Sequence, residues 1–194
     1  MPSILNSIKK ILFPLFSVFL CFQTVAIMRI LLASEPADLS ILQNFIISFL
    51  FTLFVTGIFA FIGFAYPSHK ILPSSYYTIK KPKRLNYISK TLGVKYFKFL
   101  LLFAFWGKER NRKKYFNGTK QGLKNFVFQT KQSEFGHIAA LIVILILSVI
   151  LLMHGYFVLV SIITVINIIG NLYPVILQRT HRIRIGNITR NNKE

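Results

Sequence analysis

A glutamate and a histidine three residues apart stand at the start of a long apolar stretch. Glu134 and His137 lie in Q-S-E-F-G-H, and the next sixteen residues, Ile138 to Met153, carry no charge. The E-x-x-H spacing puts both side chains on one face of a helix. A carboxylate in this position can orient or charge a histidine that removes a proton from a hydroxyl. The pair is therefore a candidate for acid/base catalysis.

Composition places this pair in a membrane protein. The 194 residues are 54% hydrophobic, yet 24 Lys and Arg stand against 5 Asp and Glu, which gives a formal net charge of +19. The apolar and the cationic residues occupy separate stretches, which is typical of an integral membrane protein and not of a nucleic-acid-binding protein. The single cysteine, Cys21, excludes an intrachain disulfide.

Four apolar stretches predict an all-α membrane protein with four transmembrane helices arranged as two hairpins. We predict a first hairpin over residues 1–66, a basic loop over 67–132 and a second hairpin over 133–194. Only His154 and Gly155 separate the last two helices, which requires a tight helical hairpin. The predicted spans are about Ile11–Met28, Ile41–Tyr66, Ile138–Met153 extended back to near Ser133, and Tyr156–Leu177.

The N-terminal apolar stretch has a second interpretation. A cleaved signal peptide also begins with basic residues, here Lys9 and Lys10, followed by an apolar segment. No small-residue cleavage site follows, and a second apolar stretch begins within about a dozen residues, so we favour a retained span.

Positive charge predicts how the spans are oriented. Every Lys and Arg except Arg29 falls in the N-terminus, the long loop or the C-terminal tail, whereas the connection between the first two spans carries Glu35 and Asp38. The positive-inside rule therefore predicts that both termini and the long loop are cytoplasmic. The expected partners are the lipid bilayer, its anionic headgroups and a lipid-linked substrate, and no nucleic acid.

The long loop contains a segment suited to the membrane–water interface. Leu92 to Gly107 is rich in aromatic residues and is flanked by lysines, but its uncharged core, Phe99 to Trp106, is too short to span a bilayer. A small soluble core element that covers the site is an equally good interpretation. A basic run, Lys108 to Phe116, follows and is expected to face solvent or lipid headgroups.

The short turn of the second hairpin determines which residues lie at the same depth. Counted from this turn, His137 is level with Asn171, and Glu134 lies one helical turn from Gln178. Ionisable and amide side chains at a membrane boundary are costly unless they have a function. We therefore take Glu134 and His137 as catalytic candidates and the two amides as positioning groups. Three cations at the exit of the last span complete the candidate substrate-binding set: Arg179, Arg182 and Arg184.

Simpler interpretations of these residues stay open. In one of them, Glu134 has a purely structural role: it pairs with Arg179 or Lys131 and so orients the hairpin. E-x-x-H also supplies two ligands in carboxylate-bridged metal sites. The other acids on the cytoplasmic side are Glu109 and Glu194 alone, so we predict no metal site. The alternative to an enzyme is a non-catalytic subunit or scaffold of a larger membrane complex.

The same residues carry a resemblance to a known family. The segments T-K-Q-S-E-F-G-H and N-L-Y-P-V-I-L-Q-R-T-H-R-I-R resemble T-x-x-x-E-x-x-H-W and N-x-x-P-x-x-x-Q-R-Y-N-R-x-R of the glycosyl-4,4'-diaponeurosporenoate acyltransferases, small bacterial membrane proteins of carotenoid biosynthesis. The loop is similar in L-G-V-K-Y-F-K, so the resemblance covers roughly residues 70–185. Ile138 replaces the Trp of the pattern, and Thr180 and His181 replace its Tyr-Asn. The matching positions are Thr130, Glu134, His137, Asn171, Pro174, Gln178, Arg179, Arg182 and Arg184.

The resemblance implies transfer of a fatty acyl group onto a sugar hydroxyl of a lipid-linked glycoside, at the cytoplasmic face of a bacterial inner membrane. In this interpretation His137 is the general base and Glu134 is its orienting partner. The arginines hold a phosphate-bearing donor, acyl-CoA or a similar co-substrate, and no resident cofactor is expected. Protein partners or an oligomer are compatible with this function.

Overall fold

The computed structural model describes residues 2–103 and 119–191, and over these ranges every regular element is a helix. Four helices are long and apolar enough to cross a membrane: Ser7–Ala33, Ile41–Ala65, Gln121–Met153 and Phe157–Thr189. The predicted all-helical fold, with four helices suited to cross a membrane, is thereby confirmed. The chain divides into two compact units, Met1–Ser68 with Gly136–Leu172 (unit 1) and His69–Phe135 with Tyr173–Glu194 (unit 2).

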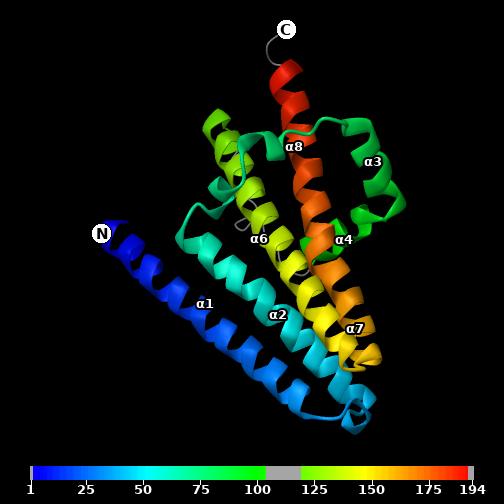
Figure 1. Ribbon diagram of the computed structural model, residues 1–194. Helices are drawn as coiled ribbons and strands as arrows, with labels where there is room; N and C mark the ends of the chain where they lie inside the picture. The colour runs from blue at the N-terminus through cyan, green and yellow to red at the C-terminus, as the bar shows by residue number, and fades with distance from the viewer. Residues whose placement is uncertain (1, 104–118, 192–194) are drawn as a thin grey trace. The chain divides into compact units, whose positions relative to one another are not determined.

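The first two helices of unit 1 lie side by side along most of their length. They are α1 (Pro2–Ala33) and α2 (Ile41–Ala65), drawn in blue and cyan in Figure 1. Gly57 allows Leu20 to approach closely, because a Cβ at this position would lie 2.5 Å from the Leu20 Cδ1 atom. Ser40 caps α2 by accepting the backbone N–H of Gln43. As the sequence predicts, α2 ends before Pro67, with Tyr66 in extended conformation.

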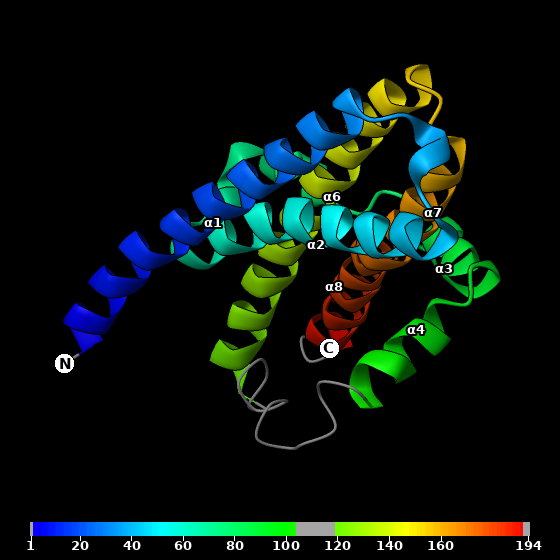
Figure 2. The same ribbon diagram turned by 90° about the horizontal axis from the view of Figure 1, so that it is seen from below.

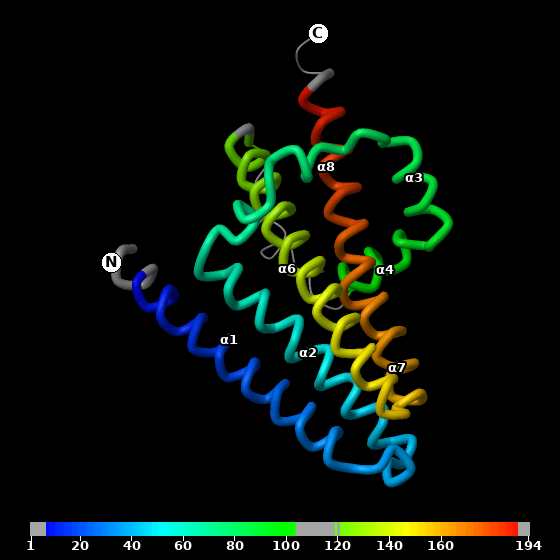
Figure 3. Tube along the Cα trace, viewed as in Figure 1, coloured from blue at the N-terminus to red at the C-terminus, as the bar shows by residue number. Residues whose placement is uncertain are grey.

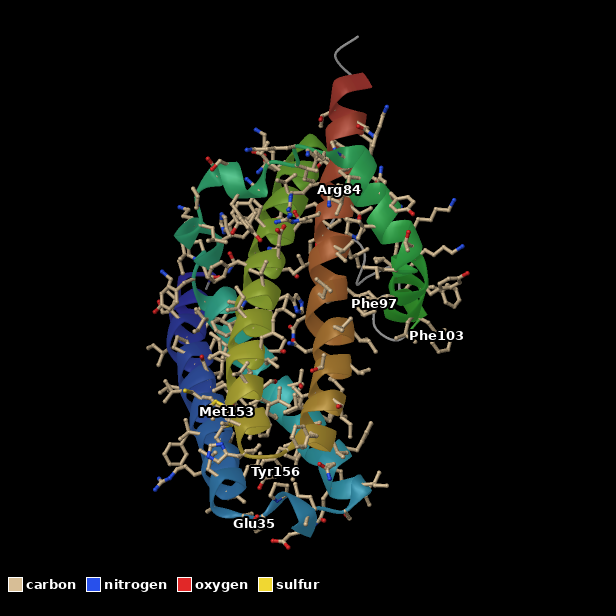
Figure 4. All side chains as sticks on the ribbon, turned by 45° about the vertical axis from the view of Figure 1, so that its right-hand side comes forward. Glu35, Arg84, Phe97, Phe103, Met153 and Tyr156 are labelled. Atoms are coloured by element: carbon tan, nitrogen blue, oxygen red, sulfur yellow. The ribbon has the colours of Figure 1, made fainter. Side chains whose placement is uncertain are left out.

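The predicted tight hairpin between the last two spans is present. Helix α6 (Lys120–Met153) ends just before Gly155, whose φ of +82° requires a residue without a Cβ, and α7 (Phe157–Asn167) follows. Figure 3 shows the turn as one narrow bend of the trace. The Tyr156 hydroxyl, labelled at this turn in Figure 4, donates to the Ser34 carbonyl at 2.8 Å and so ties the turn to the end of α1.

Unit 1 has a compact apolar core between its helices. Phe51 and Val55 of α2, Ile144 of α6, and Leu159 and Ile163 of α7 are fully buried there. Many large apolar side chains on the same helices are exposed instead, such as Phe22 (73%) and Ile41 (81%). In a helix that crosses a bilayer these side chains face lipid, so their exposure is consistent with the membrane assignment.

Helix α6 begins well before the predicted start near Ser133. The segment from Lys120 to Gln132 is polar, so hydropathy gives no signal for a helix there. Its start is marked by Thr119, whose Oγ1 accepts the backbone N–H of Gly122 at 3.0 Å. The whole helix has 34 residues, about 51 Å at 1.5 Å per residue, and exceeds the ~30 Å hydrocarbon core of a bilayer.

Helix α7 continues through a π-helical turn, η5 (Ile168–Leu172), into α8 (Tyr173–Asn191). Pro174 has no N–H to donate to the carbonyl four residues earlier, that of Gly170. A widened turn is a common response to such a lost hydrogen bond, and these turns often occur at functional sites.

The described part of the loop before residue 104 folds into short helical segments. It forms two 3-10 turns, η2 (Ser68–Ile71) and η3 (Ser74–Tyr77), and two α-helices, α3 (Pro82–Thr91) and α4 (Val94–Leu101). Figure 2 shows α3 and α4 in green beside α8, against which both pack. Gly93, with a φ of 64°, makes the bend between α3 and α4.

The predicted interfacial segment is only partly described. Within α4, Phe97 packs edge-on against Tyr173 of α8, with 5.6 Å between ring centroids, whereas Phe99 and Phe103 are 70% and 83% exposed. Figure 4 labels Phe97 and Phe103 on this part of the chain. The rest of the segment, with Trp106 and the basic run from Lys108, lies outside the described residues.

Candidate functional site

The structure confirms that His137 and Asn171 lie at the same level. Within unit 1, the Nδ1 atom of the His137 ring lies 3.0 Å from the Asn171 Oδ1 atom. The Asn171 side chain is fully buried, and its Nδ2 donates to Asn167 Oδ1 at 2.9 Å and to Thr56 Oγ1 at 3.0 Å. Asn167 in turn donates to the Leu141 carbonyl at 3.3 Å. A chain of neutral polar groups therefore holds Asn171 in one orientation.

This orientation assigns the tautomer of His137. Because Asn171 uses its Nδ2 for Thr56 and Asn167, its Oδ1 faces the imidazole and can only accept. A neutral His137 must then carry its proton on Nδ1 and its lone pair on Nε2. Of the two ring nitrogens, Nε2 is then the basic one, and it is not the nitrogen that contacts Asn171.

The π-helical turn contributes to this arrangement. It contains Asn171, and its Gly170 carbonyl has lost the usual helical donor because residue 174 is proline. The backbone of Gly170 makes a polar contact with the His137 ring instead. The sequence N-x-x-P therefore supplies both the amide and the local backbone that contact the histidine.

Unit 2 contains a buried ion-pair cluster centred on Glu134. The carboxylate is fully buried; its Oε1 accepts from Arg179 Nε at 2.7 Å, and its Oε2 accepts from Arg182 Nη2. The Arg182 side chain is 7% exposed and that of Arg179 is 31% exposed. The ion pair between Glu134 and Arg179, which the structural interpretation predicted, is thus present. Glu134 and His137 do not share a partner, because His137 contacts Asn171.

Two tyrosines of η3 cover the arginines of this cluster. The Arg179 guanidinium lies 5.1 Å from the ring centroid of Tyr76, and that of Arg182 lies 5.7 Å from the ring centroid of Tyr77. Burial raises the pKa of Tyr77 to about 12, and the negative charge of Glu134 acts in the same direction. The pKa of Tyr76 is also raised, first by burial and then by Glu134. Both phenols are therefore neutral near pH 7.

The η3 turn is itself fixed to α6 by polar contacts. The Tyr77 hydroxyl donates to the His69 carbonyl at 2.9 Å, and the His69 ring lies 2.8 Å from Gln132 Oε1. Gln178 of α8 donates to Ser133 at 3.2 Å. Gln178 thus lies near the level of Glu134, as predicted from the hairpin, but Tyr76, Tyr77 and His69 were not predicted as part of the site.

Arg184 is separate from the other two arginines. Residues 179 and 182 lie about one turn apart on α8, whereas residue 184 is rotated by about 140° from residue 179 at 100° per residue. Arg184 accordingly lines a cleft with Lys98 of α4 and not the Glu134 cluster. The predicted set of three arginines therefore divides into two that pair with Glu134 and one exposed cation that does not.

One comparison with known proteins identifies the family. The family model of the glycosyl-4,4'-diaponeurosporenoate acyltransferases matches residues 73–191, more than half of the chain. The chain belongs to this family. No curated protein and no solved structure matches it. The match agrees with the resemblance found over roughly residues 70–185 and leaves α1 and α2 outside the matched residues.

The matched range of this acyltransferase family member includes every site residue that was predicted from the sequence. It contains the His137 and Asn171 pair, the Glu134 cluster with both tyrosines, and the cleft residue Arg184. Thr56, which hydrogen-bonds Asn171, lies outside the range on α2. Its role in the site could not be predicted, because no spacing rule connects residue 56 to residue 171.

Proposed function

We propose that the protein transfers a fatty acyl group from an activated, phosphate-bearing donor onto a sugar hydroxyl of a glycosylated lipid, at the cytoplasmic face of a bacterial inner membrane. The observation that carries this proposal is the contact between His137 Nδ1 and Asn171 Oδ1, which leaves Nε2 with its lone pair. A general base for hydroxyl attack needs such a nitrogen. The family membership favours acyl transfer to a glycosylated carotenoid.

The reaction requires two proton transfers: the acceptor hydroxyl loses a proton, and the leaving group of the donor gains one. In our proposal, Nε2 of His137 takes the proton of the acceptor hydroxyl as its oxygen attacks the acyl carbonyl carbon. The carbon–sulfur bond of a thioester donor then breaks, and the leaving thiolate receives a proton from the imidazolium. Asn171 holds the imidazole in the required tautomer and accepts from Nδ1–H in both charge states.

Glu134 has a different role from the one predicted from the E-x-x-H spacing. Its two oxygens hold Arg179 and Arg182, so we propose that it positions these cations and that Asn171 positions His137. The Nε and Nη1 atoms of Arg182 are buried and have no hydrogen-bonding partner among the described residues. Buried cationic donors without partners are costly, which favours the binding of an anionic or carbonyl oxygen at Arg182.

A histidine exchange tests this proposal directly. Membranes that contain the wild-type protein, His137→Gln or His154→Gln are supplied with a long-chain acyl-CoA and a glycosylated carotenoid acceptor, and the acylated product is measured by mass spectrometry. We expect His137→Gln to lose about 10²–10⁴-fold in rate, the usual contribution of a general base. His154→Gln is the matched control, because His154 is exposed at the hairpin turn and its ring contacts the Ile150 carbonyl of the preceding helical turn.

Equal rates for the two variants, at equal amounts of membrane-inserted protein, would exclude His137 as the base. Absence of product with every variant and with the wild type would exclude acyl transfer between these substrates.

A further inference from the structure

An open cleft in unit 2 gathers cations beside an apolar wall. It has a volume of about 450 Å³ and lies among α3, α4 and α8. Its charged residues are Lys90 of α3, Lys95 and Lys98 of α4, and Arg184 of α8. Its apolar wall includes Phe99 and Leu177. The volume lies within the range of about 300–1,000 Å³ that is common for small-molecule sites.

The helical spacing of the sequence builds this cleft. Residues 177, 180 and 184 of α8 share one face at i, i+3 and i+7, and residues 94, 95, 98, 99 and 102 form one stripe along α4. In this stripe Lys95 follows Val94 and Lys98 precedes Phe99, so each of the two cations lines the cleft beside an apolar residue. The cleft is thus amphiphilic, because both cationic and apolar residues line it.

The cations of the cleft lack an acidic counterpart. Among the described residues of unit 2, the only carboxylate is Glu134, and both of its oxygens already accept from Arg179 and Arg182. Lys98 is half-buried, and its pKa is lowered first by burial and then by the positive charge of Arg184. Like charges held together in this way are destabilising unless an anion binds between them.

We propose that this cleft binds the phosphate groups of the acyl donor, with its apolar wall against the part of the donor that adjoins the phosphates. The inference rests on the proposed function for the identity of the ligand, but it concerns residues that the catalytic proposal does not use. Lysine and arginine side chains around a phosphate form charge-assisted hydrogen bonds, and the adjacent Phe99 and Leu177 distinguish an amphiphilic donor from a free phosphate. The site assigns donor recognition to Lys98 and Arg184.

The test measures binding without transfer. The full chain is placed in nanodiscs of phosphatidylcholine, and the probe is a long-chain alkyl thioether of coenzyme A, which cannot donate its chain. We expect Lys98→Gln and Arg184→Gln each to weaken binding about tenfold, and the double variant more, because a hydrogen bond to a charged group is lost in each case. Lys83→Gln and Lys124→Gln are the matched controls, since both remove an exposed unit 2 cation that does not line the cleft.

Two further arms separate the sources of phosphate. Coenzyme A without an alkyl chain should bind more weakly than the thioether, and phosphatidylglycerol in the nanodisc should leave thioether binding intact. The charge-conserving Arg184→Lys should retain most of the affinity and so show that the cleft variants still fold. Equal affinity of cleft and control variants, or loss of wild-type binding when phosphatidylglycerol is present, would overturn the proposal.

Failure of this inference differs from failure of the proposed function. If transfer proceeds and its KM for the donor is unchanged in Lys98→Gln and Arg184→Gln, the donor binds elsewhere and the cleft assignment is wrong. If the thioether binds through the cleft but no variant and no wild-type protein transfers an acyl group, the acyltransferase proposal is wrong and the binding site stands.

Discussion

Replacement of Glu134 by glutamine should destabilise the protein strongly. The carboxylate is fully buried, and its partner Arg182 is 7% exposed, so the substitution leaves a buried guanidinium without its counter-charge. Removal of one partner from a buried ion pair costs about 3–5 kcal/mol. The Arg179 arm adds little, since that side chain is 31% exposed and such pairs contribute about 0–1 kcal/mol. We therefore expect a loss of about 3 kcal/mol, carried almost entirely by Arg182.

A double-mutant cycle isolates this interaction. Arg182→Gln alone should cost about 2 kcal/mol, because Glu134 keeps Arg179 as a partner. In Glu134→Gln/Arg182→Gln two amides can hydrogen-bond without a buried charge, so the costs should fall short of additivity by about 2 kcal/mol. Lys124 is an exposed cation on α6, the helix that contains Glu134, so Lys124→Gln should change stability by no more than about 0.5 kcal/mol.

Unfolding in mixed micelles with increasing denaturing detergent, followed by far-ultraviolet circular dichroism, measures these free energies. If Glu134→Gln proves as mild as Lys124→Gln, or if the two costs simply add in the double variant, the Glu134–Arg182 pair does not stabilise the fold.

Three further predictions concern other parts of the structure. Gly155→Ala should lower the free energy of unfolding by about 1–2 kcal/mol because φ is +82°, whereas Gly186→Ala, in α8 with open space around it, should raise it by about 0.5–1 kcal/mol; the same detergent titration compares them. Because the pKa of Tyr77 is raised to about 12 from about 10 in an unfolded chain, its contribution to stability is complete below pH 10 and is lost as the pH rises through 12. Spectrophotometric titration of phenolate absorbance, compared with Tyr77→Phe, should show this late-ionising group, and ionisation near pH 10 would contradict it. Asn171→Leu should lower kcat for acyl transfer by about 10–100-fold, with little change in KM, because His137 loses its orienting acceptor; an unchanged kcat would show that the contact is only structural.

The membrane-spanning framework follows from the sequence because lipid imposes simple rules. Uncharged runs long enough to cross the bilayer, the two-residue break at Gly155 and the proline after Tyr66 predict the four helices and two of their ends. The start of α6 was missed, because Lys120 to Gln132 is a polar helix that depends on packing and on the Thr119 cap. Hydropathy identifies helices that contact lipid, and it does not identify polar helices such as this one.

The site was predictable where two residues share one hairpin. The depth of His137 relative to Asn171 follows from counting residues away from a short turn, and the structure confirms it with a 3.0 Å contact. The tyrosines that contact the arginines lie in η3, a short turn of the loop. No periodicity in the sequence predicts where such a turn packs, so these contacts could not be predicted. The separation of Arg184 from the other arginines was open to prediction from its angle around α8, but the R-x-x-R-x-R pattern suggested a single group instead.

The choice of partner for each ionisable side chain follows the solvent that surrounds it. His137 belongs to a unit made almost wholly of apolar spans, where a buried carboxylate partner would carry a large desolvation cost. A neutral amide gives the ring the same acceptor without a charge, and Thr56 and Asn167 complete the hydrogen bonds of that amide. Glu134, by contrast, is neutralised by two arginines at once, so its charge is tolerated when buried. The two residues of an E-x-x-H motif in a membrane protein therefore need not act as one catalytic pair. Each can be stabilised in its buried position by a hydrogen-bonding partner from another helical segment.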